Sequence, residues 1–187
     1  MLRALPALLT LILLLPASVR AQLQREQSDH TKPSIGPNWI FYTPSDADHG
    51  AWGTGIQGKL PAGPEYALQA SLDRTHHSAA GANYKDTPLQ FSLLGYFTPE
   101  SPGSFYVMLG YGWYWVSVDG PGAHTETGTR PHVGAGLELL SAGRFSFDAS
   151  YRFIWSAVYR PSDYGHPFGS GFQERGHMWT LSAAYRF

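Results

Sequence analysis

The chain has 187 residues, of which 43% are hydrophobic and only 14% charged, and it contains 10 Phe, 11 Tyr, 6 Trp and no Cys. The lack of cysteine excludes a disulfide framework and thiolate chemistry, and a net charge of -1 argues against a nucleic-acid-binding protein. Many aromatic residues and few charges, with a mean hydropathy of -0.23, suit neither a helical membrane protein nor an ordinary soluble enzyme.

Residues 1–21 have the pattern of a secretory signal peptide. Arg3 supplies the positive start, an apolar segment follows at 4–15, and small residues occupy positions 19 and 21. An apolar segment of about 12 residues is too short to cross a bilayer as a helix, which needs ~20. We therefore expect export and cleavage near Ala21.

Apolar residues alternate with polar or small ones along most of the remaining chain, which is typical of strands that have one apolar face. The clearest example is 144–158, where Phe145 and Phe147 alternate with Ser146 and Asp148. Pro37 restricts the first candidate strand, 35–42, to a strand start or a bulge there. In chain order, the predicted strands are 35–42, 51–60, 65–75, 87–97, 104–118, 131–140, 144–158 and 177–187.

The polar faces of these strands decide between a soluble barrel and a membrane barrel. They carry three acids and three bases, which a narrow interior neutralises by pairing charges. Their glycines suit an eight-stranded barrel, which is just wide enough for side chains to fill it. We therefore predict an all-β, closed antiparallel eight-stranded up-and-down transmembrane β-barrel over residues 35–187. The predicted interior charge network is Lys59, Asp73, Glu138, Asp148, Arg152 and Arg186.

The connections between the strands alternate in length, as in outer-membrane barrels with long extracellular loops and short periplasmic turns. The predicted long loops are 43–50, 76–86, 119–130 and 159–176, and the short turns are 61–64, 98–103 and 141–143. This arrangement places both ends of the barrel on the periplasmic side. We therefore expect 22–34 to form a polar periplasmic segment.

Five tryptophans fall on the apolar faces near the predicted extracellular strand ends. Tryptophan favours the boundary between lipid and water because its apolar ring carries one hydrogen-bond donor. Aromatic residues at the opposite ends supply a second girdle. The lipid-interface girdle is predicted to contain Trp52, Trp113, Trp115, Trp155, Trp179, Tyr185 and Phe187.

The signal peptide, the strand rhythm and the closing segment from Trp179 to Phe187 resemble those of the small eight-stranded outer-membrane barrels of Gram-negative bacteria, the OmpA transmembrane-domain and OmpX type. The resemblance implies a monomer in the outer membrane, recognised by the outer-membrane assembly machinery through a C-terminal strand that ends in Phe. Because the chain stops at Phe187, we expect no periplasmic domain of the OmpA type to follow.

Five basic residues near the predicted outer rim are candidate contacts for lipopolysaccharide phosphates, although ordinary solvated charge is an equally good interpretation. They are Arg74, Lys85, Arg130, Arg160 and Arg175. Seven histidines are expected in the loops or at strand tops, next to acidic residues. They are His49, His76, His77, His124, His132, His166 and His177. The spacing matches no known metal motif, so we predict neither a metal site nor a cofactor.

The function expected from these features is that of a structural outer-membrane protein whose loops form a surface interaction module, and not of a general porin. The alternative is an enzyme that modifies lipid A, an acyl hydrolase or acyltransferase. Such a hydrolase needs Ser, His and an acid in mutual reach. The candidate sets are Ser117 with His124 and Glu126, and Ser170 with Glu174 and His177. The His-x-Ser-Asn element of lipid A deacylases is absent, so we predict no enzyme.

Overall fold

The computed structural model describes residues 32–45, 49–79, 82–99, 103–119, 123–140, 144–155 and 175–187. The predicted signal peptide and residues 22–31 of the predicted periplasmic segment lie outside this part of the chain. Within it, no helix has the length and apolar character needed to cross a membrane.

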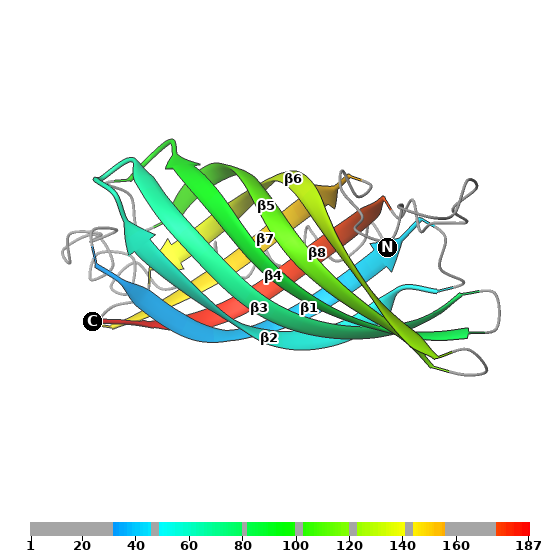
Figure 1. The fold of residues 1–187 in the computed structure, drawn as a ribbon. Helices are drawn as coiled ribbons and strands as arrows, with labels where there is room; N and C mark the ends of the chain where they lie inside the picture. The colour runs from blue at the N-terminus through cyan, green and yellow to red at the C-terminus, as the bar shows by residue number, and fades with distance from the viewer. Residues whose placement is uncertain are drawn as a thin grey trace.

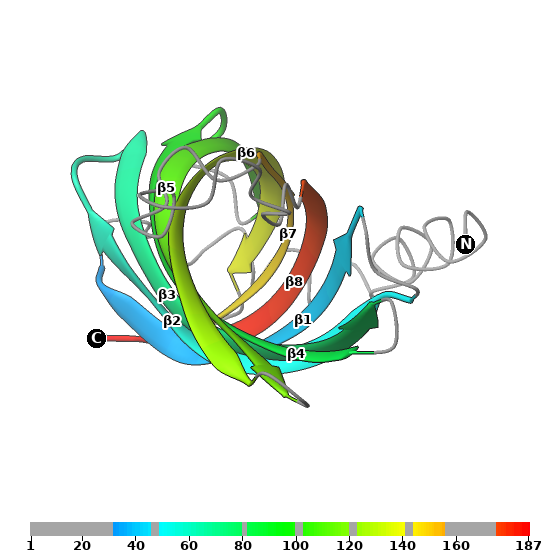
Figure 2. The same cartoon turned by 45° about the vertical axis from the view of Figure 1, so that its right-hand side comes forward.

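Eight antiparallel strands close into a barrel, in which each strand pairs with the next and β1 pairs with β8. Figure 1 shows the barrel from the side, and Figure 2 shows the strands closing into a ring. The predicted all-β, closed eight-stranded fold is therefore confirmed. The strands are β1 (Ser34–Pro44), β2 (Ala51–Pro61), β3 (Tyr66–Ala79), β4 (Ala82–Tyr96), β5 (Gly103–Asp119), β6 (His124–Leu140), β7 (Phe145–Ile154) and β8 (Gly176–Arg186).

Pro37 lies inside β1, and the prediction that it marks a strand start or a bulge is wrong. It pairs with Ile56 of β2, and the same register offset with β8 holds on both sides of it. The pairing with β8 nevertheless skips Gly36 and Pro37, because proline has no N–H group to donate to a ladder. Trp39 consequently points outward from β1, while Asn38 and Ile40 point inward.

Two of the predicted long loops are largely strand. β3 and β4 continue to Ala79 and Ala82, and β5 and β6 continue to Asp119 and His124. These segments are polar on both faces, so no apolar alternation marked them as strands. As a result, β3 to β6 are 14 to 17 residues long, whereas the other four strands have 10 or 11. Their paired tips project at the end of the barrel opposite Phe187 (Figure 1).

The strand predicted for 144–158 ends at Ile154, and residues 156–158 lie outside the described part of the chain. The predicted loop 159–176 also lies outside it, except for Arg175 and Gly176.

The interior contains two buried apolar clusters besides its polar groups. The cluster nearer the projecting tips comprises Ile40, Tyr42, Tyr114, Val116, Ile154 and Met178. The cluster nearer the C-terminus comprises Ala67, Leu94, Tyr96, Tyr106 and Met108. Tyrosine and methionine therefore take up much of the space between the polar groups.

Candidate functional site

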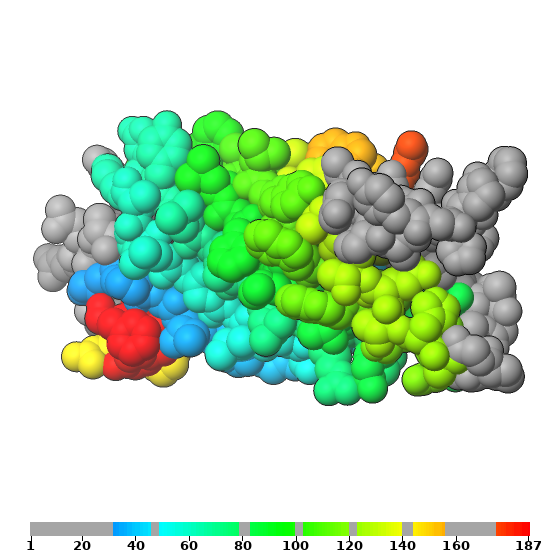
Figure 3. Space-filling view, in the orientation of Figure 1, coloured from blue at the N-terminus to red at the C-terminus, as the bar shows by residue number. Residues whose placement is uncertain are grey.

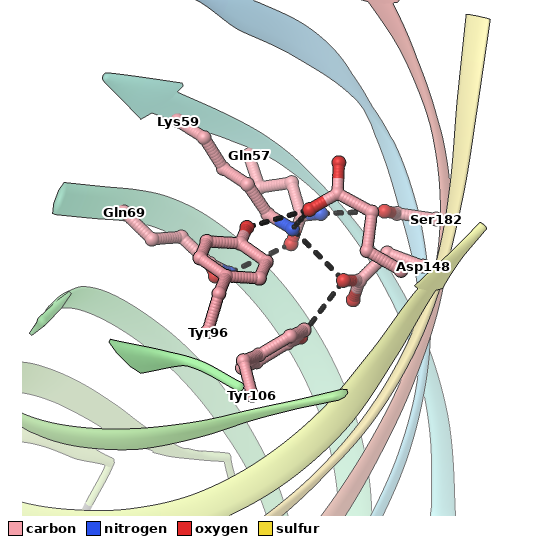
Figure 4. A network of polar contacts seen from close by, with 8 residues as sticks. Gln57, Lys59, Gln69, Tyr96, Tyr106, Asp148 and Ser182 are labelled. Carbon is pink, nitrogen blue, oxygen red and sulfur yellow. Dashed lines mark hydrogen bonds and ion pairs between the residues drawn. The ribbon is translucent and has the colours of Figure 1, made fainter. Parts of the chain in front are cut away.

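In the half of the barrel interior nearer the C-terminus, one ammonium group contacts two carboxylates. Lys59 Nζ lies 2.8 Å from Glu138 Oε2 and 2.9 Å from Asp148 Oδ2. The hydroxyl of Tyr96 donates to Glu138 Oε2 at 2.6 Å, and that of Tyr106 donates to Asp148 Oδ2 at 2.8 Å. The five side chains come from β2, β4, β5, β6 and β7 and converge in the lumen (Figure 4). This lysine cluster therefore ties together strands that are distant along the chain.

Two amides and one hydroxyl form a chain of hydrogen bonds that reaches β8. Gln69 Nε2 donates to Gln57 Oε1 at 2.8 Å, and Gln57 Nε2 donates to Ser182 Oγ at 2.5 Å (Figure 4). Gln57, Gln69 and Ser182 are all buried. Together they link β2, β3 and β8 across the interior.

A second polar group surrounds Arg152, whose side chain is fully buried. Its guanidinium donates to Ser71 Oγ at 3.4 Å and to Gln90 Oε1. Asp73 accepts hydrogen bonds from Asn38 at 3.0 Å and from Ser71 at 3.1 Å. Ser71 thus connects Arg152 with Asp73, so that both charges are held in one hydrogen-bonded group.

The six residues predicted as an interior charge network, Lys59, Asp73, Glu138, Asp148, Arg152 and Arg186, are all buried inside the barrel. Lys59, Glu138 and Asp148 meet in the lysine cluster, while Asp73 and Arg152 meet through Ser71. Arg186 lies near the C-terminal end of the barrel and donates to the Phe145 carbonyl oxygen at 3.4 Å.

The outer wall is apolar and aromatic. Each predicted girdle residue points outward, and Trp52, at 72% exposure, is the most open of them. Trp39 is a further outward tryptophan, which the sequence missed because the phase of β1 was not determined. Trp113 and Trp115 lie within β5 and not at its tip, because β5 continues to Asp119.

The barrel is apolar outside and charged and hydrogen-bonded inside, and comparisons with known proteins agree with this arrangement. Residues 7–187 match the model of the family described as "Outer membrane protein beta-barrel domain". The chain belongs to this family. Its members are barrels of the Gram-negative outer membrane, so the apolar wall of this outer-membrane barrel faces lipid.

Solved structures of other small barrels share the fold. Neisserial surface protein A (NspA) is 14% identical, with a TM-score of 0.65, and the match covers 83% of this chain and 96% of NspA. Ail of Yersinia pestis, solved with the heparin analogue sucrose octasulfate, is 18% identical, with a TM-score of 0.54 and coverages of 83% and 97%. OprG of Pseudomonas aeruginosa is 10% identical, with a TM-score of 0.53 and coverages of 88% and 98%. No curated protein sequence matches the chain.

One cation predicted at the outer rim is inside this outer-membrane barrel. Arg130 is only 3% exposed, donates to the Tyr42 hydroxyl at 3.3 Å and lies over the Tyr114 ring. The prediction is wrong because residue 130 was placed in a loop, whereas β6 includes it with the inward phase of His132. Arg74 and Arg175 are exposed and Lys85 is half-buried, whereas Arg160 lies outside the described residues.

Two histidines predicted for loops or strand tops are also buried in the lumen. His132 Nε2 lies 2.8 Å from Ser92 Oγ. His77 Nδ1 lies 3.3 Å from Asp86 Oδ2, and its ring stacks on that of Tyr84. His166 lies outside the described residues. Within the described part of this outer-membrane barrel, no three His, Cys, Asp or Glu side chains come together as they would in a metal site.

The structure does not assemble the catalytic set predicted around Ser117. Ser117 Oγ lies 3.1 Å from Thr125 Oγ1, its partner in the register of β5 and β6. His124 pairs with Val118, one residue further along, so His124 and Ser117 occupy opposite faces of the hairpin. His124 Nε2 instead lies 3.2 Å from Glu126 Oε1. The second set cannot be placed, because Ser170 and Glu174 lie outside the described residues.

Sequence reasoning missed the tyrosines and amides that complete the interior. The alternation along the strands gives an inward position to each of these residues, Tyr96, Tyr106, Gln57 and Gln90, and it is the signal from which they could have been found. Their partners lie up to 125 residues away along the chain, and the pattern of a single strand holds no information about such pairing.

Proposed function

We propose that this barrel is a structural outer-membrane protein whose projecting β3–β4 and β5–β6 tips form a surface interaction module that contacts lipopolysaccharide. The filled interior supports a structural role over that of a general porin. The largest fully buried side chains include Arg152, Tyr42, Tyr106 and Tyr114, which all point into the lumen. In an eight-stranded barrel, side chains of this size are enough to fill the inside.

The observation that carries the proposal is a change in the outward side chains along β3 to β6, the wall that faces the viewer in Figure 3. At the level of Trp113, the outward residues are Leu72, Leu89, Trp113 and Thr129. Two residues further toward the tips they are Arg74, Thr87, Trp115 and Thr127, and after two more they are His76, Lys85, Ser117 and Thr125. Each step is about 6.6 Å along a strand.

This gradient matches a lipid that has hydrocarbon chains below and anionic sugars above. Leu72 and Leu89 suit hydrocarbon, and tryptophan suits the boundary. Arg74 and Lys85 would form charge-assisted hydrogen bonds with phosphate, and the hydroxyl groups beside them suit sugars. The lipid with these properties in the outer leaflet is lipopolysaccharide. Ail, which shares the fold, has been crystallised with a sulfated sugar analogue, and this too is an anionic carbohydrate.

The Arg74→Gln/Lys85→Gln variant should bind lipopolysaccharide about tenfold more weakly, because two charge-assisted contacts of about 0.7 kcal/mol each are lost. The measurement is the affinity of the purified barrel in neutral detergent for fluorescently labelled lipopolysaccharide. The difference between variant and wild type should shrink in high salt, because these exposed charges are screened. The control is Arg144→Gln, which removes a cation that bonds Tyr185 near the opposite end.

Equal affinities of the wild type and the double variant would refute the lipopolysaccharide contact. The alternative, an enzyme that modifies lipid A, is tested by comparing the acyl pattern of lipid A from cells with and without the protein. A changed pattern would replace the structural role with lipid A modification.

A further inference from the structure

The lipid-facing wall carries a groove of about 450 Å³ that we call the oblique groove. It begins at Phe97, just after β4, crosses β5 to β8 and then β1, and ends at Trp52 near the start of β2. It therefore lies mostly on the other side of the barrel from the cations of β3 and β4. Its volume is within the range of ligand-binding pockets, about 300–1,000 Å³.

The groove runs between two rows of paired outward residues. One row passes through Leu137, Ala149 and Leu181, and the other passes through Ala135, Tyr151 and Trp179. Paired residues lie along the hydrogen-bonding direction, so the groove crosses the strands and does not follow them. Because strands of such barrels tilt by about 35–45°, the groove descends obliquely through the lipid layer.

Small side chains produce the depth of the groove. Ala135 and Ala149 place single methyl groups where neighbouring outward positions carry valine, leucine or aromatic side chains. Gly136 and Ser150 lie between them at positions that face the lumen, so the floor of the groove there is backbone.

The length and lining of the groove suit a hydrocarbon chain. From β4 to β2 by this route there are six strand spacings, about 29 Å in total. The outward side chains along the groove are all aliphatic or aromatic, so an extended hydrocarbon chain packs along it with one side open to the bilayer.

The two ends of the groove differ in chemistry. At the end near the projecting tips, Trp52 and Trp179 bring indole N–H donors, and the Tyr151 hydroxyl lies 2.6 Å from His177 Nδ1. At the opposite end, Phe97 and Phe105 offer no side-chain hydrogen-bonding group. A lipid head group therefore finds polar partners at the extracellular end, and the chain of an outer-leaflet lipid runs down the groove as far as Ala149 and Ala135.

We propose that the oblique groove binds one acyl chain of a lipid A molecule in the outer leaflet. The proposal depends on the position of the barrel in the outer membrane and not on the contacts of Arg74 and Lys85. The groove would hold a specific lipid against this wall, while the rest of the wall exchanges lipids freely.

The test fills the groove. The wild type and the Ala135→Leu/Ala149→Leu variant, purified from outer membranes, are incubated with an equimolar mixture of hexa-acylated lipid A and a phosphatidylethanolamine, washed with detergent and analysed by native mass spectrometry. The wild type should retain one lipid A per barrel, and the variant at least fivefold less. The matched control is Ala70→Leu, which adds the same bulk to an outward alanine of β3 outside the groove.

Retention of lipid A by the filled variant at the wild-type level would overturn the proposal, as would retention of phosphatidylethanolamine in its place or of no lipid by the wild type. If the double variant does not fold, as judged by heat-modifiable migration in gels, Ala149→Leu alone should reduce retention. Repeating the series in the Arg74→Gln/Lys85→Gln background tests the groove separately from the lipopolysaccharide contact.

Discussion

Replacing Lys59 with methionine should lower the free energy of unfolding of the barrel by about 3–5 kcal/mol. The ammonium contacts both Glu138 and Asp148, at 2.8 and 2.9 Å, and all three side chains are buried. Removing it leaves two buried carboxylates in the lumen without the cation they share. The measurement is urea-induced unfolding in lipid vesicles, followed by tryptophan fluorescence.

Two companion variants isolate the charge effect in the lysine cluster. Lys85→Met makes the same substitution at a half-buried outward position and should change stability by less than about 0.5 kcal/mol. The triple variant Lys59→Met/Glu138→Gln/Asp148→Asn should recover most of the loss, because it removes both carboxylates together with the cation they share. If Lys59→Met were as stable as the wild type, the lysine cluster would not stabilise the barrel.

Placing arginine at Leu109 should destabilise the barrel by about 2–4 kcal/mol. Leu109 is 62% exposed on β5, halfway between Phe105 and Trp113, so its side chain lies in the hydrocarbon layer. The cost arises from moving a guanidinium into lipid and is therefore specific to a wall that faces the bilayer. The same unfolding measurement in vesicles detects it.

Ser117→Arg is the matched control, because Ser117 lies on the same face of β5 as Leu109, eight residues closer to the tip. Outside the hydrocarbon layer the expected cost is about 0–1 kcal/mol. Equal costs at the two positions would mean that the hydrocarbon layer does not end between Leu109 and Ser117. The gradient along this wall would then be misassigned.

The faces of the strands could be predicted because lipid and lumen impose opposite chemistry on alternate residues. In β7, the inward positions of Asp148 and Arg152 follow directly from that alternation. The same rule failed beyond the lipid layer, where neither face needs to be apolar. For this reason the pattern predicts loops at residues 76–86 and 119–130 and gives no sign that Arg130 faces inward.

The partners of the interior charges could not be predicted from the sequence. Lys59 meets Glu138 and Asp148 at separations of 79 and 89 residues. Such contacts depend on how strands that are not neighbours in the barrel are shifted relative to one another. The sequence of a single strand does not contain this information. The oblique groove has the same origin, because Ala135 and Ala149 become adjacent only through the register of β6 and β7.

One face of each strand is assigned to lipid and the other to a filled lumen, and β5 offers the most direct test of this assignment. Since the chain contains no cysteine, single cysteines can be placed at residues 106–109, 111, 113 and 114 and labelled with a nitroxide in a bilayer. The odd-numbered positions, from Val107 to Trp113, should be accessible to oxygen dissolved in the lipid, and the even-numbered positions, 106, 108 and 114, to neither oxygen nor an aqueous nickel complex. Odd-numbered positions that are open to the nickel complex, or even-numbered positions that are open to oxygen, would contradict the assignment.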